Sequence, residues 1–150
     1  MTPFQLSAAP IDPASLRATL EDPTAGALVT FEGWVRNHHQ GRAVERLGYS
    51  AYEPLALKEG ARILAEALER FPLAQAQAVH RIGDLAIGDC AVWVGVASSH
   101  RQEAFAACSW IIDAIKGRVP VWKEEFYADG SVAWVDPTAE PSPAADRRSE

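Results

Sequence analysis

Residues 98–125 read SSHRQEAFAACSWIIDAIKGRVPVWKEE, and this stretch determines how the rest of the chain is interpreted. Ser99 followed by Gln102 fits the capping box that opens many helices, and Gly117 is typical of the residue that ends one. The stretch therefore predicts a helix over residues 100–116 with Ser99 as its N-cap. Apolar residues recur at helical spacing and predict a buried stripe of Phe105, Cys108, Ile112 and Ile115.

Cationic side chains gather at both ends of this predicted helix. His100 and Arg101 fall in its first turn, where they oppose a helix dipole that favours carboxylates. Lys116 and Lys123 lie near its other end, although the chain has only three lysines. A phosphate bound at the N-terminus of this helix would offset the unfavourable placement of His100 and Arg101. The backbone N–H groups, the helix dipole and the two side chains would bind the phosphate together. The alternative is a solvated arginine beside a histidine bonded to nearby backbone.

Strand and helix patterns alternate on both sides of this stretch, without internal repeats. Two strands, 27–36 and 44–52, flank a short loop and predict a hairpin. Asp12 and Pro13 predict the start of a short helix that runs to about Leu20, and a longer helix is expected from Pro54 to about Phe71, with an apolar stripe of Leu57, Ala61, Leu64, Leu68 and Phe71. Two further strands are expected over residues 75–82 and 90–97. The last expected element is a hairpin of strands 121–127 and 132–135 that turns at Asp129-Gly130.

This order predicts an α+β fold, with two main helices covering one side of a mostly antiparallel sheet. The central βαββαβ portion also fits a ferredoxin-like arrangement, and the pattern does not separate the two. Residues 1–136 are expected to form a single domain. The Pro-rich and charged composition of residues 137–150 predicts a disordered C-terminal tail.

Composition and charge limit the class of protein. A chain of 150 residues that is 48% hydrophobic is long enough to bury one core. Its net charge of −6 argues against a protein that binds nucleic acid or anionic membranes in general. The sequence shows neither a signal peptide nor an apolar run long enough to span a membrane. We therefore expect a soluble, cytoplasmic protein with no nucleic-acid or membrane partner.

The cysteines and histidines do not follow the spacing of a metal site. Cys90 opens a predicted strand and Cys108 lies on the apolar stripe, which is typical of two buried thiols. His38 and His39 lack a third and fourth ligand at useful spacing, so we expect no metal there. His80 is expected to be hydrogen-bonded at a strand end.

Several motifs occur in the order and register of one known family. They are Phe31-Glu32-Gly33-Trp34-Val35-Arg36-Asn37-His38, His80-Arg81-Ile82-Gly83, Ser99-His100-Arg101, Ala104-Phe105, Ile112-Asp113-Ala114-Ile115-Lys116 and Pro120-Val121-Trp122-Lys123-Glu124-Glu125. Together they resemble the large, catalytic subunit of molybdopterin synthase, the molybdenum cofactor biosynthesis protein E family. The resemblance covers residues 26–136. Ser50 and Leu55 depart from the family's usual Glu and Met, at a helix entry.

The resemblance implies an α/β-hammerhead fold and a specific reaction. The family converts cyclic pyranopterin monophosphate into molybdopterin by installing a dithiolene. Each sulfur comes from the C-terminal thiocarboxylate of a small ubiquitin-like sulfur-carrier subunit that ends in Gly-Gly. The step needs no metal, nucleotide or other cofactor. The implied assembly is a heterotetramer, with a homodimer of large subunits at its core.

The resemblance also implies the site residues. Lys116 and Lys123 are the expected catalytic groups. The expected substrate-binding residues are Trp34, Val35, Arg36, His100, Arg101, Lys116, Lys123, Glu124 and Glu125. Elementary chemistry agrees, because a phosphate ester and a thiocarboxylate both need cations, and a desolvated lysine can move protons. The alternatives are a helix-terminal charge for Lys116 and an exposed strand lysine paired with Glu125 for Lys123.

Helix geometry adds an expectation about assembly. At a rise of about 1.5 Å per residue, the helix from His100 to Lys116 is about 24 Å long, too far for one small pocket to span. If both ends serve one substrate, a second copy of the chain must supply one of them. The alternative function is a non-catalytic, ferredoxin-like module that binds a phosphate ligand or docks a protein with the same cations.

Overall fold

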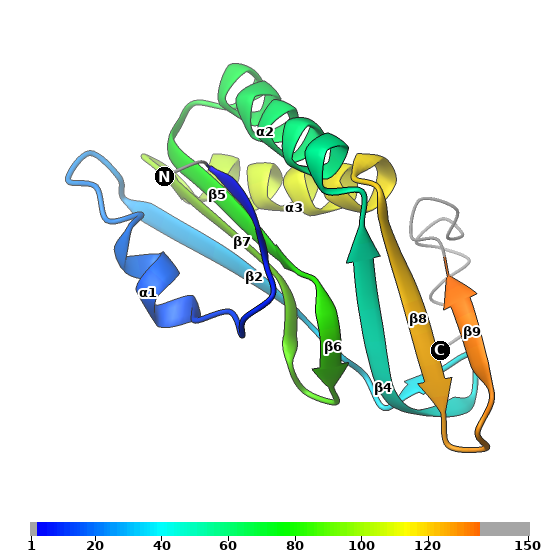
Figure 1. Cartoon of the computed structure of the whole chain (residues 1–150). Coiled ribbons are helices and arrows are strands. Elements are labelled where there is room, and N and C mark those ends of the chain that lie inside the picture. Colours follow the sequence, from blue (N-terminus) through cyan, green and yellow to red (C-terminus); the bar gives the residue numbers. More distant parts are fainter. Residues whose placement is uncertain (1–2, 136–150) are drawn as a thin grey trace.

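The strands divide between two sheets in the computed structural model, which describes residues 3–135 (Figure 1). The first sheet has the order β1 (Phe4–Ser7), β5 (Leu73–Arg81), β7 (Cys90–Ser98) and β2 (Ala27–Trp34). The second has the order β3 (His38–His39), β4 (Arg42–Ala51), β8 (Val121–Tyr127) and β9 (Val132–Val135), and β6 (Gly83–Ala86) also pairs with β4. The helices are α1 (Pro13–Ala18), α2 (Glu53–Arg70) and α3 (Arg101–Arg118).

The main core lies between the first sheet and the helices α2 and α3 (Figure 1). Strand β7 is central to it, and eight of its nine residues are buried. Val94 and Val96 of β7 face the two long helices, while Trp93 and Gly95 meet Leu20 just after α1, on the other face of the sheet. Because both faces of β7 are covered, its sequence is continuously apolar instead of alternating.

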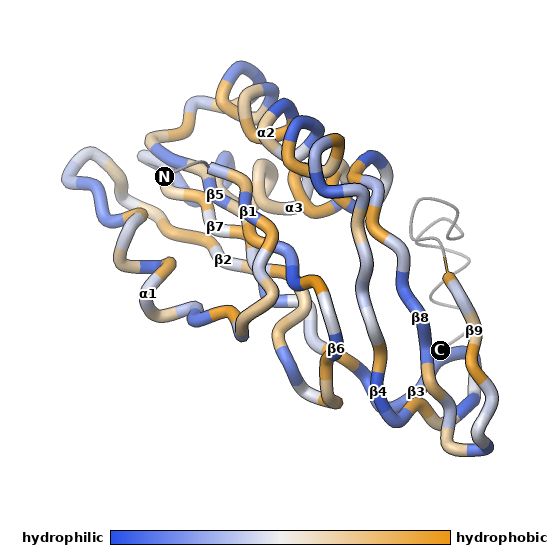
Figure 2. Tube along the Cα trace, viewed as in Figure 1, coloured by the Kyte–Doolittle hydropathy of each residue, from blue (hydrophilic) through white to orange (hydrophobic). Residues whose placement is uncertain are grey.

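A smaller core holds the second sheet together. Its buried residues are Val35, Val44, Leu47, Leu85, Ala91 and Tyr127. Strand β8 carries a hydrophilic run, Lys123 to Glu125, between more hydrophobic ends, as Figure 2 shows. The second sheet therefore brings charged side chains next to a packed apolar layer.

The predicted α+β class is confirmed. Asp12 caps α1, where its carboxylate accepts a hydrogen bond from the Ser15 amide. The final hairpin also forms as predicted, with Gly130 at φ 89° in its turn. The strands divide between two sheets instead of forming one ferredoxin-like sheet. Strand β6 was not expected, and residues 136–150, including the predicted tail, lie outside the described residues.

The predicted hairpin between residues 27–36 and 44–52 is wrong. Strand β2 pairs instead with β7, and β4 pairs with β8 and β6 in the other sheet. The chain crosses between sheets at Val35 and turns back in a much shorter hairpin of β3 and β4. Gln40 and Gly41 both have positive φ there, as a two-residue turn of this type requires. Local turn signals could not show that β2 has a more distant partner.

The predicted ends of the main helix are also wrong. His100, not Ser99, is the N-cap of α3, and its side chain makes no capping hydrogen bond. Gly117 lies inside the helix, which continues to Arg118. Val119 is extended because Pro120 follows it, and a residue before proline is sterically biased away from helical backbone. Proline, not glycine, therefore ends α3.

The buried faces of both long helices are shifted from the predicted stripes. Helix α2 buries Ala56, Gly60, Ile63, Leu64 and Ala67, and α3 buries Ala104, Ala107, Cys108, Ile111 and Ile115. Of the predicted stripe residues, Leu57, Leu68 and Phe105 are exposed. Small side chains let each helix approach the sheet closely, so the largest apolar residues did not mark the packed face.

Gly60 provides a test of this close packing. A Cβ on Gly60 would overlap the ring of the buried Phe4, whereas a Cβ on the exposed Gly117 of α3 would meet nothing within 4 Å. We predict that Gly60→Ala lowers the free energy of unfolding by about 1–3 kcal/mol through overpacking. The matched change Gly117→Ala should raise it by about 0.5–1 kcal/mol, because alanine favours helix. Urea unfolding measures both, and equal effects of the two changes would contradict the packing described.

Candidate active site

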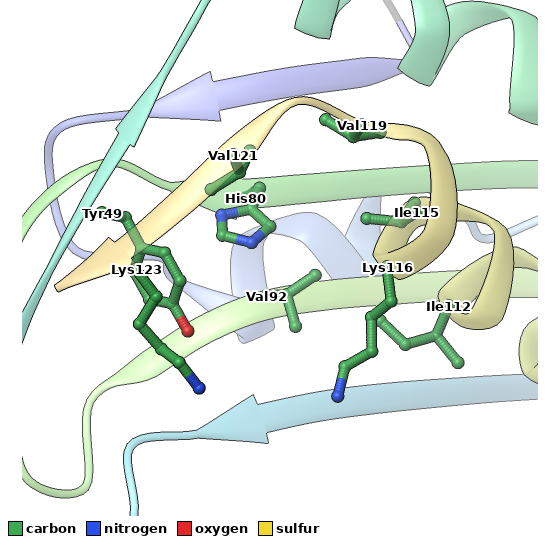
Figure 3. Close-up of a pocket in the computed structure, with 9 residues that line it drawn as sticks. All are labelled: Tyr49, His80, Val92, Ile112, Ile115, Lys116, Val119, Val121 and Lys123. Carbon is green, nitrogen blue, oxygen red and sulfur yellow. The ribbon is translucent and has the colours of Figure 1, made fainter. Parts of the chain in front are cut away.

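Lys116 and Lys123 line the same pocket, although they come from different elements. Lys116 lies in the last turn of α3 and Lys123 lies in β8. Figure 3 shows their side chains on two sides of a cavity of about 70 Å³. The residues that line it are Tyr49, His80, Val92, Ile112, Ile115, Lys116, Val119, Val121 and Lys123.

The connection between α3 and β8 explains why the two lysines meet. Because Pro120 ends the helix, the chain turns directly into β8 after Val119. Side chains alternate along a strand, so Val121, Lys123 and Glu125 share one face of β8. That face is turned toward the last turn of α3, where Lys116 lies.

A second small cavity, of about 60 Å³, adjoins the first and shares Lys123 and Tyr49 with it. It lies where the chain passes from β2 into β3. The other residues that line it are Trp34, Val35, Arg36, His38, His39, Leu47 and Glu125. The structure thus brings together the predicted site residues of two distant motifs.

Glu125 supplies a buried carboxylate to this second cavity. Its side chain is 3% exposed, and the Tyr127 hydroxyl donates to its Oε1 at 3.4 Å. His39 Nε2 lies 3.9 Å from the same oxygen, and Arg36 Nη2 lies 3.5 Å from His39 Nδ1. Burial, together with the charge of Glu125, raises the pKa of Tyr127. The phenol therefore remains protonated and can donate to the carboxylate.

His80 lies in the first cavity and was expected only to be hydrogen-bonded at a strand end. That bond exists, since Nδ1 lies 2.7 Å from the carbonyl oxygen of Arg81. The ring also packs edge-on against Tyr49, with centroids 4.9 Å apart. Burial lowers the pKa of His80 to about 4, and the positive charge of the nearby Lys116 also lowers it. The hydrogen bond to Arg81 acts in the opposite direction and raises the pKa. His80 is therefore neutral at pH 7. Its place in the 80–83 motif was the one sequence signal for a role in the site.

His100 and Arg101 lie at the opposite end of α3 from this pocket. They line a separate surface depression of about 400 Å³ together with Gly26, Ser99 and Gln102. At about 1.5 Å per residue, the length of α3 separates them from Lys116 by more than 20 Å. A single chain does not bring the two predicted groups of cations together.

Two more residues lie outside the pocket. Glu124 alternates with Lys123 and Glu125 along β8, so it belongs to the opposite face of the strand. Arg118 forms ion pairs with Glu59 and Glu66 of α2, at 3.2 and 2.7 Å. Arg118 thus ties the two long helices together and adds no charge to the lysine pocket.

No group of three His, Cys, Asp or Glu side chains suited to holding a metal ion occurs in residues 3–135. Cys90 and Cys108 are both free, and burial raises the pKa of each thiol to about 11. Neither thiol is therefore an activated nucleophile at neutral pH. No helix within the described range is both long and apolar enough to cross a membrane.

Comparison with known proteins decides the family. The family model described as MoaE protein matches residues 6–118. The chain belongs to the MoaE family. It is 46% identical over 119 residues to the molybdopterin synthase catalytic subunit of Pyrococcus abyssi. This alignment covers 79% of this chain and 80% of the Pyrococcus protein. The predicted family and enzyme class, molybdopterin synthase, are therefore confirmed.

Solved MoaE structures share the fold. The crystal structure of molybdopterin synthase from Staphylococcus aureus matches with a TM-score of 0.85 and 38% identity, over 90% of this chain and 98% of that one. A Helicobacter pylori structure, a protein-protein complex of subunits 1 and 2 of molybdopterin-converting factor, matches with a TM-score of 0.74. At 18% identity, over 92% and 93% of the two chains, that match shows the fold alone.

The buried His80 predicts that stability depends on pH. Its pKa is about 4 in the folded chain and about 6.5 once unfolding exposes the ring, so the unfolded chain binds a proton that the folded chain excludes. The stability that comes from keeping His80 neutral is fully present above about pH 6.5. It is lost as the pH falls toward 4, by up to about 1.4 kcal/mol for each pH unit. From about pH 7 to about pH 4.5, the free energy of unfolding of the wild type, measured in urea, should fall by about 1–3 kcal/mol more than that of His80→Asn. Equal losses would show that His80 is not held neutral.

Proposed function

We propose that this MoaE-family chain transfers sulfur to cyclic pyranopterin monophosphate and so produces molybdopterin. The sulfur donor is the C-terminal thiocarboxylate of a small ubiquitin-like subunit ending in Gly-Gly. The observation that carries the proposal is the single pocket lined by Lys116 and Lys123, in a chain with only one other lysine. The sequence relatives, which are named catalytic subunits, favour this function over a non-catalytic phosphate-binding module.

The reaction needs positive charge at the place where the two lysines lie. Both the phosphate ester and the thiocarboxylate are anions, and they must approach each other before sulfur can add. Two ammonium groups reduce this repulsion and stabilise the negative charge that develops on oxygen. A lysine can also donate or accept the protons that move when the acyl carboxylate of the partner is released.

The size of the pocket favours a site completed by a second copy of the chain. The two adjoining cavities, of about 70 and 60 Å³, are each well below the ~300–1,000 Å³ of pockets that enclose a small-molecule ligand. Lys116 is also exposed in the single chain. A partner that covers it would both enlarge the binding surface and exclude water.

We infer that His100 and Arg101 of the second copy provide this cover. Arg101 is cationic, both side chains are exposed, and both lie too far along α3 to reach Lys116 of their own chain. In a two-fold dimer each chain would give its α3 N-terminus to the other chain's lysine pocket. His100 and Arg101 would then bind the phosphate while the lysines act at the carbons that receive sulfur.

The remaining site residues have supporting roles in this proposal. Trp34, Val35, Arg36 and Glu125 border the second cavity, beside Lys123. Glu124 lies on the other face of β8 and is the weakest of the predicted substrate contacts. The small subunit would bind as in the complex seen for Helicobacter pylori, giving a heterotetramer built on the homodimer. We infer that the assembly works in the cytoplasm.

The lysines provide the direct test. Lys116→Ala and Lys123→Ala should each reduce turnover by about 10²-fold or more, because a charge-stabilising or proton-transferring group is lost. Lys58→Ala is the matched control, since Lys58 is the third lysine and is exposed on α2. Dithiolene formation is measured with the thiocarboxylated partner, and thermal unfolding checks the fold. Wild-type turnover in both pocket variants would exclude their catalytic role.

A mixing experiment tests the shared site. An Arg101→Ala chain and a Lys116→Ala chain should each be inactive as homodimers. Mixed dimers should regain activity, because one of their two sites would contain neither substitution. With random exchange we expect recovery of about a quarter of wild-type activity. If subunits exchange, as followed by mass spectrometry, and activity stays absent, each site is built within a single chain.

A further inference from the structure

His80 also lines the lysine pocket, and the proposed chemistry does not use it. It lies on β5, away from both α3 and β8 in sequence, and is 8% exposed. Figure 3 shows its ring between Val121 and Val92, with the side chains of Lys116 and Lys123 on either side. A ligand held between the two lysines would therefore meet the imidazole at the inner end of the pocket.

The hydrogen bond to Arg81 fixes which ring nitrogen faces a ligand as an acceptor. A carbonyl oxygen only accepts hydrogen bonds, so Nδ1 of His80 must carry the proton that it receives. In a neutral imidazole the other nitrogen, Nε2, then has a lone pair and no proton. The Arg81 carbonyl thus selects a tautomer in which Nε2 accepts.

Nε2 makes no hydrogen bond within residues 3–135, although Lys116, Lys123 and Tyr49 carry donors in the same pocket. Five of the side chains that line the pocket are aliphatic and offer no donor: Val92, Ile112, Ile115, Val119 and Val121. Tyr49 contacts the imidazole through its ring, in an edge-on arrangement at 83°. Nε2 is not among the fully buried side-chain atoms of the described residues that lack a partner, so it is accessible from the pocket. A bound molecule with a donor at this point would satisfy His80.

We propose that Nε2 of His80 accepts a hydrogen bond from an N–H or O–H group of the substrate and thereby helps to select it. This inference rests on the proposed function, since a pterin carries N–H donors beside its anionic groups. The pocket would then require two features together: negative charge between Lys116 and Lys123, and a donor at its inner end. An acceptor-only anion, such as sulfate, would pair with the lysines but would offer no proton to the lone pair on Nε2 of His80.

Two substitutions separate the two nitrogens of His80. In His80→Asn the side-chain amide can still donate to the Arg81 carbonyl, but nothing replaces Nε2. In His80→Gln the longer side chain can place an amide oxygen near the position of Nε2. We expect His80→Asn to reduce kcat/KM by about 10- to 100-fold, the usual effect of losing a buried hydrogen bond to substrate, and His80→Gln to reduce it by less than about 5-fold. Thermal unfolding of both variants reports on the fold.

A second measurement avoids both turnover and mutation. The ¹⁵N signal of His80 Nε2 is recorded in the wild-type homodimer, without the small subunit, as cyclic pyranopterin monophosphate is added. The signal should shift from that of a bare acceptor toward that of a hydrogen-bonded one, and sulfate, which has no O–H donor, should not produce the shift at the same concentration. This comparison stays decisive if a His80 variant fails to fold.

The outcomes distinguish this inference from the proposed function. If the precursor binds without moving the Nε2 signal, or if His80→Asn folds and retains wild-type kcat/KM, His80 only supports the fold and the inference is wrong. If the signal moves but the complete thiocarboxylated complex forms no dithiolene, the proposed function fails and the hydrogen bond stands. If the precursor does not bind to wild type, both are overturned.

Discussion

The steric restriction that Pro120 places on Val119 is the constraint on which the site depends. It ends α3 at Arg118 and holds Val119 in an extended conformation, so that β8 begins directly after Pro120. The carbonyl of Pro120 also accepts a hydrogen bond from the Tyr52 amide, at the start of α2. This short connection therefore links both long helices and two strands. It also holds Lys116 of α3 opposite Lys123 of β8.

The second determinant is the small size of the residues on the helix faces. Gly60 and Ala67 of α2, and Ala104 and Ala107 of α3, allow the helix backbones to lie close to the first sheet. Close packing of this kind tolerates little change in volume. It makes the end of α3 a rigid support, which a site needs if charged side chains are to keep their positions.

The sequence predicted the positions of the helices and strands better than it predicted which strands pair with one another. Motifs and turn residues located both long helices, the last hairpin and the two lysines, because these signals are local. The pairing of β2 with β7 could not be predicted, since it joins residues 56 to 71 positions apart, from Trp34 with Cys90 to Ala27 with Ser98. His80 was missed as a site residue for the same reason. Its place in a strand suggested burial, but only the folded chain brings it between Lys116 and Lys123.

The pairing of the strands also determines when the site can exist as the protein is made. Strand β1 lies beside β5, with Phe4 opposite Ala78, and β4 lies beside β8, with Ala51 opposite Val121. On the ribosome, therefore, Phe4 has no sheet to enter until more than seventy further residues have emerged. The pocket must wait longer still, for β8. Folding that depends on such distant contacts is slow, and the nascent chain exposes apolar strands in the meantime.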